Sequence, residues 1–353
     1  MDISKFDYFL PRELIANKPA NPRDSSRLLV VNRESKKISH FKFSELPSLL
    51  NKNDVLVFNK SKVFPARIYG KKKTKGNVEV LILRFLPESV CEVITKPGLF
   101  MYDRIFFDDM EAQVIKRENY ITHLKFDLDD IDLLHKIGII GHTPIPPYIK
   151  SSLSERDLRD KYQTVYAKTV GSAAAPTAGL HFTKDLMKKL KRKGIRMEFL
   201  TLHVGLGTFA PVKEKNILDH KIHEEYFEVE PETIKRLNDA KKSGKRIIAV
   251  GTTTTRVLET LSLKNNSLSA KYTKPYTELF IYPPYKFKFV DAKITNFHLP
   301  KSTLLLLISA FVSQPNTEDV FSDFESSIIG NAYEKAIQKR YRFFSFGDAC
   351  FIE

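Results

Sequence analysis

Three histidines in loops, two of them beside glycines, are the side chains of this chain best suited to chemistry. His181 lies in the segment PTAGLHFT, His203 in LHVGLGTF and His298 in TNFHLP. An imidazole changes protonation near neutral pH, so it can act as a general base or a general acid. Gly179 and Gly205 allow backbone conformations that other residues avoid. We therefore expect these loops to perform acid–base chemistry on a substrate held close to the backbone.

Each of these loops also has a structural interpretation that the sequence leaves open. PTAGLHFT could be an ordinary loop in which Thr183 caps the following helix. His203 could be a histidine held within the packing of a partly apolar strand. Gly205 and Gly207 resemble a nucleotide-binding loop only weakly, because no third glycine opens a helix. The small residues 172–175 before PTAGLHFT have no packing period, which predicts a backbone close to a ligand.

The segment HKIHEE places His220 and His223 beside Glu224 and Glu225. It resembles a metal site, but its spacing differs from the helical motif of zinc hydrolases and no cysteine joins it. We therefore expect no metal here. A polar cluster that contacts substrate is the preferred interpretation, with His223 as an acid–base candidate and Glu225 as a weaker one.

One further loop follows a predicted strand and carries hydroxyl groups, and the loop of His298 also carries an amide side chain. VGTTTTR contains Thr252 and Thr253, whose amides and hydroxyls could hold a ribose, a carboxylate or a phosphate. A threonine cap on a buried helix is the alternative, and the Gly-Lys-Ser/Thr ending of a P-loop is missing. Asn296 precedes His298 in TNFHLP. Without a cysteine nucleophile or a Gly-x-Ser-x-Gly elbow, the pattern argues against hydrolases.

The elements that must position these loops alternate between strand and helix. Apolar runs at 28–31, 54–59 and 246–250 and an alternating stretch at 195–204 predict strands, with helices at 184–193, 231–243 and 302–312. This alternation predicts an α/β core, with a largely parallel or mixed sheet flanked by helices. We also expect aromatic strands at 279–282 and 287–290.

Short strand-like segments separated by turn residues fill the stretch between 66 and about 128, which predicts a small antiparallel barrel. The stiff connector HTPIPPY follows it. We therefore predict a discontinuous α/β catalytic core, 1–65 and 151–353, interrupted by an inserted β-barrel domain, 66–150.

Composition restricts the class of protein. The chain has 353 residues, two distant cysteines and no apolar run long enough to cross a bilayer. It opens without a signal-peptide pattern, so we expect a cytoplasmic protein with no membrane partner. The net charge of +15 favours a polyanionic partner such as RNA. A lysine-rich, solvated surface is the alternative.

The longer motifs resemble one family. YQTVYAK, GSAAAPTAGLHF, TLHVGLGTFAPV, IAVGTTTTR, TNFHLPKSTLLLLISAF and YRFFSFGDACFI, with the opening FDYFLPRELIANKPANPRDSSRLLVV, are together similar to the S-adenosylmethionine:tRNA ribosyltransferase-isomerases of queuosine biosynthesis. The resemblance covers nearly the whole chain in order. It implies an α/β core interrupted by a β-barrel.

The resemblance also implies the reaction. The ribosyl part of S-adenosylmethionine would be transferred and isomerised onto 7-aminomethyl-7-deazaguanine at the wobble position of tRNA, giving epoxyqueuosine-tRNA, adenine and methionine. S-adenosylmethionine would be a co-substrate, with no metal or redox cofactor. We expect a monomer that binds the anticodon stem-loop.

Residue roles within this reaction are predictions from side-chain chemistry. The acid–base and sugar-contacting candidates are His181, His203, His223 and His298, with Glu225. The candidates for the S-adenosylmethionine pocket are Gly179, Gly205, Thr252, Thr253 and Asn296. The candidates for contact with tRNA phosphate, or with the carboxylate of S-adenosylmethionine, are Arg27, Arg67, Arg256, Arg340 and Arg342.

Two other functions remain as alternatives. An S-adenosylmethionine-dependent RNA methyltransferase would need a glycine-rich loop after its first strand and an acidic residue ending the next, and neither is clear. A non-catalytic RNA-binding protein would explain the charge and the basic, aromatic segment KRYRFFSFGD, but not the histidine loops.

Overall fold

A mixed nine-stranded sheet forms the centre of the larger part of the molecule. The computed structural model describes residues 1–118, 121–205, 212–222, 224–272 and 275–353. In the order β15-β13-β12-β3-β14-β16-β17-β1-β2, the strands are β15 (Tyr276–Thr277), β13 (Glu225–Glu228), β12 (Arg196–Leu202), β3 (Asp54–Asn59), β14 (Arg246–Val250), β16 (Ala292–Asn296), β17 (Ala349–Ile352), β1 (Arg27–Val31) and β2 (Ile38–Lys42). The central strands β12, β3, β14 and β16 run parallel to their neighbours in this group.

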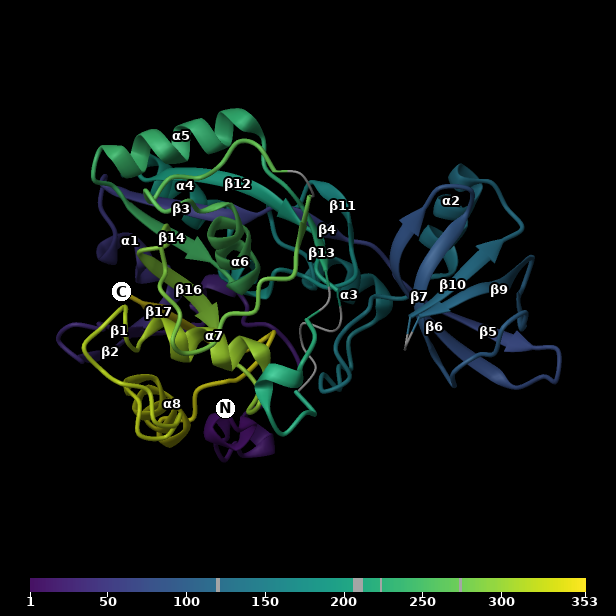
Figure 1. Ribbon diagram of the computed structural model, residues 1–353, viewed down its shortest axis with the longest axis horizontal. Coiled ribbons are helices and arrows are strands. Elements are labelled where there is room, and N and C mark those ends of the chain that lie inside the picture. Colours follow the sequence, from purple (N-terminus) through teal and green to yellow (C-terminus); the bar gives the residue numbers. More distant parts are fainter. Residues whose placement is uncertain (119–120, 206–211, 223, 273–274) are drawn as a thin grey trace.

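Helices cover both faces of this sheet (Figure 1). The helices of the core are α1 (Leu46–Leu49), α3 (Glu155–Lys161), α4 (Lys184–Arg192), α5 (Pro231–Lys242), α6 (Thr252–Leu261), α7 (Thr303–Phe311) and α8 (Ile328–Gln338). Along β3, Val55 and Val57 pack in the cluster with α5 to α8, whereas Leu56 and Phe58 pack with α1 and α4. Because a central strand is buried on both faces, its sequence is a continuous apolar run.

The second part is a closed six-stranded barrel, which Figure 1 shows beside the core. Its order is β10-β7-β6-β5-β8-β9, with β5 (Arg67–Lys72), β6 (Asn77–Leu86), β7 (Val90–Lys96), β8 (Arg104–Phe107), β9 (Met110–Glu118) and β10 (Ile121–Phe126). The helix α2 (Asp130–Ile140) follows it. The structure therefore confirms the predicted fold class, an α/β core interrupted by a small barrel. The exact domain boundaries at 66 and 150 stay a prediction.

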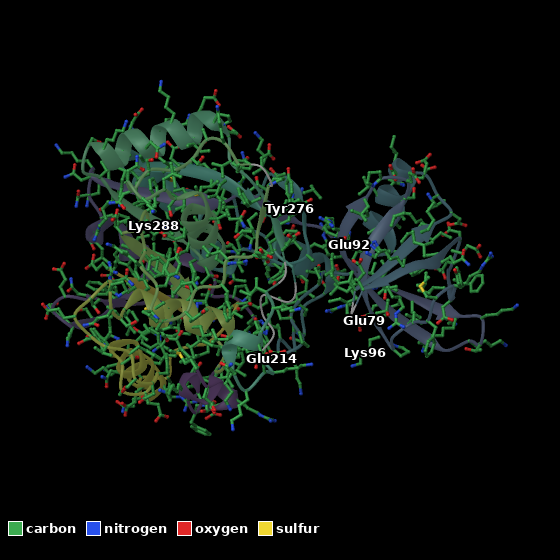
Figure 2. All side chains as sticks on the ribbon, in the orientation of Figure 1. Glu79, Glu92, Lys96, Glu214, Tyr276 and Lys288 are labelled. Carbon is green, nitrogen blue, oxygen red and sulfur yellow. The ribbon has the colours of Figure 1, made fainter. Side chains whose placement is uncertain are left out.

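The chain passes between the two parts through a small parallel pair, β4 (Ser61–Val63) with β11 (Thr169–Ser172). Side-chain contacts also link them, among them one made by Arg84. Arg84 of the barrel donates to the Tyr276 hydroxyl of the core (3.0 Å) and to Glu92 of the barrel (2.5 Å). Figure 2 shows Tyr276 and Glu92 on the two sides of this junction.

Two expectations about local structure are wrong. Neither 279–282 nor 287–290 is a strand. The amides of Lys288, Phe289 and Val290 instead bond the buried carboxylate of Glu259, on α6. A side chain thus supplies the acceptors that a neighbouring strand would otherwise provide.

The small residues before PTAGLHFT pack against protein, where we expected a ligand. Ala173, Ala174 and Ala175 are fully buried, and each belongs to a different apolar cluster. Small side chains let these three clusters meet closely where the barrel joins the core. Within the described residues, no helix is both long and apolar enough to cross a membrane.

Candidate active site at the carboxyl edge of the sheet

The predicted site loops leave the same edge of the sheet. Asn59 ends β3, His203 follows β12, Gly251 follows β14 and Asn296 ends β16. The carboxyl ends of parallel strands meet at one edge, where ligands of open α/β sheets bind. Asn59 ties two of these ends together, because its amide accepts from the Leu202 amide (3.1 Å) and donates to the Leu202 carbonyl (2.9 Å).

His181 is buried between two polar partners. Its Nδ1 lies 2.8 Å from Ser26 Oγ and its Nε2 lies 3.1 Å from Asn296 Nδ2, while its ring stacks on Phe43. Because the Asn296 amide donates to Nε2, the proton of the neutral ring is assigned to Nδ1, which donates to Ser26. Burial lowers the pKa of His181 to about 4, so the ring is neutral near pH 7. With both nitrogens bonded, its clearest role is to orient Asn296.

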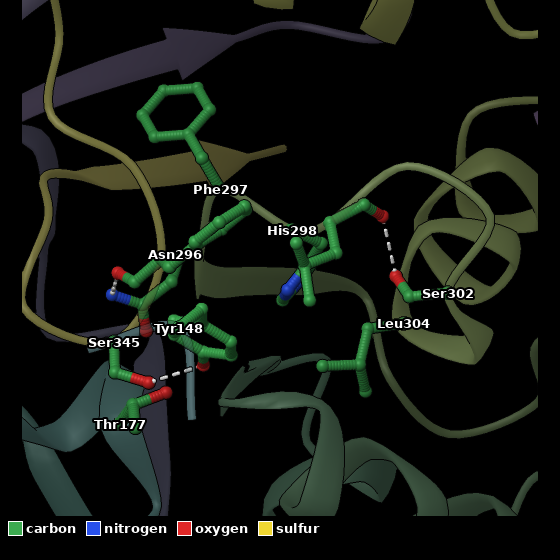
Figure 3. Close-up of a pocket in the computed structure, with 10 residues that line it drawn as sticks. Tyr148, Thr177, Asn296, Phe297, His298, Ser302, Leu304 and Ser345 are labelled. Atoms are coloured by element: carbon green, nitrogen blue, oxygen red, sulfur yellow. Dashed lines mark hydrogen bonds between the residues drawn. The ribbon is translucent and has the colours of Figure 1, made fainter. Parts of the chain in front are cut away.

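His298 is also buried and lines a pocket. Its Nε2 lies 2.8 Å from Thr295 Oγ1, and burial lowers the pKa of His298 to about 3. The pocket is small, with a cavity volume of about 20 Å³. It is lined by Tyr148, Thr177, Asn296, Phe297, His298, Leu299, Ser302, Leu304, Phe344 and Ser345. Figure 3 shows Asn296, His298, Tyr148 and Leu304 around this space.

His203 differs from the other two histidines. Its ring is only half-buried, stacks on Tyr226 and packs against Gly171, where an added Cβ would lie 2.7 Å from the ring. Burial lowers its pKa below the ordinary value of 6.5. Among the described residues, no hydrogen bond occupies either ring nitrogen of His203. It is therefore the histidine best placed to accept a proton from a substrate.

Glu225 and Arg256 form a buried ion pair beside Gly205. Glu225 accepts from an Arg256 guanidinium nitrogen and from the Gly205 amide (3.0 Å). Arg256 is 6% exposed and also donates to the Leu279 and Thr277 carbonyls. The guanidinium therefore presents no surface to RNA phosphate, although we expected such a contact. Instead, the pair fixes Gly205 at the start of its loop.

The threonines of VGTTTTR begin α6. Gly251 has φ +92°, a conformation that favours glycine, and its amide donates to the Ile294 carbonyl of the neighbouring strand. Thr253 Oγ1 lies 3.5 Å from Asn59 Nδ2, which places Thr253 at the same edge. Thr252 is 7% exposed beside it. The sequence placed both threonines in the S-adenosylmethionine pocket, and this stays a prediction.

Gly179 makes room for a protein side chain. An added Cβ would lie 1.9 Å from the Tyr166 hydroxyl oxygen. Gly179 lies in a short 3-10 helix, Thr177–His181, and Thr183 then caps α4 through the Leu186 amide. The cap interpretation of Thr183 is thus confirmed. Packing against Tyr166 therefore requires a glycine at this position, in addition to any role that Gly179 has in binding.

Three of the predicted phosphate contacts gather around Asp348. Arg27 and Arg342 both bond its buried carboxylate, and Arg27 also donates to the Arg340 carbonyl. Arg340 itself is exposed. Arg67 lies apart from them, at the start of the barrel, where it donates to the Ile145 carbonyl and pairs with Glu79.

The HKIHEE segment is only partly described. His223 lies outside the described residues, and His220 bonds Glu214 (2.8 Å). Within the described part of the chain, no group of three potential ligands could hold a metal ion.

Sequence reasoning missed the residues that hold the histidines and close the pocket. Ser26 bonds His181, Thr295 bonds His298, and the hydroxyls of Tyr148 and Ser345 bond each other (2.9 Å). Tyr148 follows the proline connector, and Ser345 lies in the aromatic segment after α8. Neither position carries a local signal of binding, because only the tertiary fold brings them to β16.

Comparisons with known proteins agree with this architecture. The profile of a family described as "Queuosine biosynthesis protein" matches residues 3–352. The chain is 48% identical to the S-adenosylmethionine:tRNA ribosyltransferase-isomerase of Thermosipho melanesiensis, over 100% of both chains. It is 46% identical, with the same coverage, to the protein of that name from Carboxydothermus hydrogenoformans. A crystal structure of S-adenosylmethionine tRNA ribosyltransferase from Thermotoga maritima is similar, with TM-score 0.54 and 35% identity over 99% of this chain and 100% of that one.

Proposed function

Because the chain belongs to the queuosine biosynthesis protein family and is a transferase of the ribosyltransferase-isomerase type, we propose that it modifies the wobble nucleotide of tRNA. It transfers and isomerises the ribosyl part of S-adenosylmethionine onto 7-aminomethyl-7-deazaguanine. The products are epoxyqueuosine-tRNA, adenine and methionine. The observation that carries this proposal is the 48% identity over the whole of both chains, which includes core and barrel together.

The chemistry of the substrate explains why histidines suit this site. A sulfonium acidifies the neighbouring ribose carbon, so a general base can begin the reaction by removing that proton. The ring of His203 is partly exposed, and no hydrogen bond from the described residues occupies its nitrogens, so it is our candidate for this base. His181 is the positioning residue for Asn296, and His298 lines the pocket beside it. S-adenosylmethionine is a co-substrate here, and these steps require no metal or redox cofactor.

The tRNA partner fits the charge of the molecule. The net charge of +15 favours a polyanion, and the exposed Arg340 lies beside Arg27 and Arg342 near the segment that lines the pocket. We propose that this surface contacts phosphates of the anticodon stem-loop. The protein would act on it as a cytoplasmic monomer.

The reaction is tested by product analysis. Purified protein is incubated with S-adenosylmethionine and tRNA that carries 7-aminomethyl-7-deazaguanine at the wobble position. Mass spectrometry should detect epoxyqueuosine in the tRNA and free adenine in equal amounts, and tRNA with unmodified guanine should give neither. Formation of S-adenosylhomocysteine with a methylated tRNA would contradict the proposal and indicate a methyltransferase instead.

A further inference from the structure

Two strands of the core hold the ring of His203. The ring stacks on Tyr226 of β13, with ring centroids 5.5 Å apart and planes inclined by 13°. The backbone amide of His203 also donates to the Tyr226 carbonyl (2.9 Å). Gly171 of β11 packs against the same ring, and its φ of +139° and missing side chain leave room for it. The orientation of the imidazole is therefore set by two neighbouring elements.

The first of these elements, β11, is attached directly to the barrel. Beside His203, the Val204 amide donates to Ser172 Oγ (2.8 Å), and the Ala173 amide donates to the Val204 carbonyl (3.1 Å). Ala173 packs in the apolar cluster of the barrel together with Ile68. The strand also pairs with β4, through which the chain enters the barrel. The backbone on this side of His203 is thus continuous with the barrel's own packing.

The second element, β13, reaches the barrel through side chains. Tyr226 is paired with Tyr276 of β15, and their rings meet edge to face with centroids 5.6 Å apart. The Tyr276 hydroxyl accepts from Arg84 of β6 (3.0 Å), and the guanidinium lies over the Tyr276 ring at 5.5 Å. Glu92 of β7 holds the same guanidinium, and Figure 2 shows Tyr276 and Glu92 at the two ends of this contact. An unbroken series of contacts therefore joins the barrel to the imidazole.

We propose that Tyr226 is a positioning residue for His203, and that Arg84 of the barrel fixes the place of Tyr226 through Tyr276. This inference rests on the proposed function, because His203 is the base of that reaction. Packing against the faces of the ring fixes the direction in which its nitrogens point. A displacement of about 1 Å can cost an enzyme roughly 10²-fold in rate, so this direction matters for turnover. The barrel thereby takes part in catalysis without touching the reacting atoms.

Titration of the protein without substrate tests the contact with Tyr226. Burial lowers the pKa of His203, so loss of the stacked ring should raise that pKa toward 6.5. Tyr226→Ala should show this rise in an NMR titration of isotope-labelled histidine rings, with His203→Gln to identify the signal. Tyr226→Phe, which keeps a stacking ring, should restore the wild-type value. An unchanged pKa of His203 in folded Tyr226→Ala would overturn the proposal.

Turnover measures the consequence for catalysis. Tyr226→Ala should lower kcat for adenine release by at least about tenfold and change the KM for tRNA by less than about twofold, because the base is displaced and the RNA contacts remain. The acid limb of its pH–rate profile should move to higher pH together with the pKa of His203. Tyr226→Phe should recover most of kcat. A loss confined to KM would mean that Tyr226 binds substrate, and it would refute the positioning role.

A double-mutant cycle tests the link to the barrel. Arg84→Met removes the donor and Tyr276→Phe removes the acceptor, and each should lower kcat by roughly two- to tenfold. Because both act through one contact, the double variant should lose no more than either single variant. Arg104→Met is the matched control and should keep the wild-type kcat, since Arg104 forms a similar ion pair with Glu111 within the barrel. Additive losses, or a loss in only one single variant or in neither, would refute the link.

These outcomes are distinguishable from failure of the proposed reaction. The titration needs no turnover. If the pKa of His203 follows the Tyr226 variants as expected but no adenine is released from S-adenosylmethionine, the positioning of His203 stands and the proposed reaction fails. If adenine is released and Tyr226→Ala changes neither the pKa of His203 nor kcat, the reaction stands and the positioning role fails.

Discussion

The three described histidines of the site differ in how well they can accept a proton, because their contacts differ. Hydrogen bonds occupy His181 on both nitrogens and His298 on Nε2, and burial lowers the pKa of each far below 6.5. A general base works best when its pKa lies near the working pH. His203, with a less perturbed environment and no hydrogen bond to its ring within the described residues, meets that condition better. The same residue type therefore serves for positioning in one loop and for proton transfer in another.

Replacing His203 tests this division. His203→Gln should lower kcat for adenine release by about 10²–10⁴-fold, because the base is removed. In the wild type, the rate should fall as the pH drops through the pKa of His203, which lies below 6.5, because the protonated ring cannot accept a proton. The variant should lose that acid limb in a pH–rate profile. The control is His135→Gln, at an exposed site on α2 in the barrel part. Full activity of folded His203→Gln would refute the role of His203 as the general base.

Gly179 allows a prediction about packing alone. Gly179→Ala should lower the free energy of unfolding by about 1–3 kcal/mol, because its Cβ would overlap the Tyr166 hydroxyl. That hydroxyl is buried without a partner, so Tyr166→Phe alone should be neutral or stabilising. The double variant should recover part of the loss. Urea denaturation of the four proteins measures the coupling, and simple additivity would show that the two groups do not clash.

Among the elements, β16 combines the pocket residue Asn296 with a buried amine. Lys293 is fully buried, and its Nζ has no hydrogen-bond partner among the described residues. It lies over the Phe311 ring at 5.8 Å. Desolvation lowers the pKa of Lys293 from 10.5 to about 7. The strand therefore carries a charge that is unfavourable in the folded state at neutral and acid pH.

The sign of the pH dependence follows from this lowered pKa. Between about pH 7 and pH 10.5 the unfolded chain keeps the Lys293 proton and the folded protein releases it, so stability rises with pH. Below about pH 7 Lys293 is charged in both states, so the full cost of burying its charge destabilises the folded protein. Between about pH 7 and pH 10.5, the free energy of unfolding of the wild type should rise by up to roughly 1.4 kcal/mol per pH unit relative to that of Lys293→Met. Lys293→Met should also be the more stable protein near neutral pH.

Urea denaturation at several pH values compares the two proteins. Lys286→Met is the matched control, because Lys286 is exposed and its removal should leave the pH dependence unchanged. Parallel stability curves for wild type and Lys293→Met would show that the amine is not desolvated.

Elements with strong periodic patterns could be predicted from sequence, and contacts between distant elements could not. The apolar run at 246–250 and the cap at Thr183 are local signals, and both are confirmed in β14 and α4. The segment 287–290 looks like a strand, but Glu259 of α6 bonds its amides. Likewise, basic Arg256 suggests an RNA contact, and only the tertiary structure shows its buried partner Glu225. Which polar groups meet depends on pairings that no local pattern contains.

For the whole molecule, charge is divided unequally between core and barrel. Residues 66–150 carry 13 Lys and Arg against 12 Asp and Glu, so the rest of the chain holds nearly all of the excess of +15. A polyanion is therefore attracted mainly to the core. The exposed Arg340, beside Arg27 and Arg342, belongs to that basic part and adjoins the segment that reaches the pocket. The barrel hairpin with Lys71, Lys72 and Lys73 is a local exception.

The salt dependence of tRNA binding separates these two surfaces. Each phosphate contact contributes about one to the slope of log affinity against log salt, because its neutralisation releases counterions. Arg340→Gln should therefore reduce the slope by about one. Lys73→Gln, which removes an exposed cation from the barrel hairpin, is the matched control and should leave the slope unchanged. Fluorescence anisotropy with a labelled anticodon stem-loop measures both variants. The reverse result, with a smaller slope only for Lys73→Gln, would assign the phosphate contacts to the barrel, because the neutral balance of that part would then conceal a basic face.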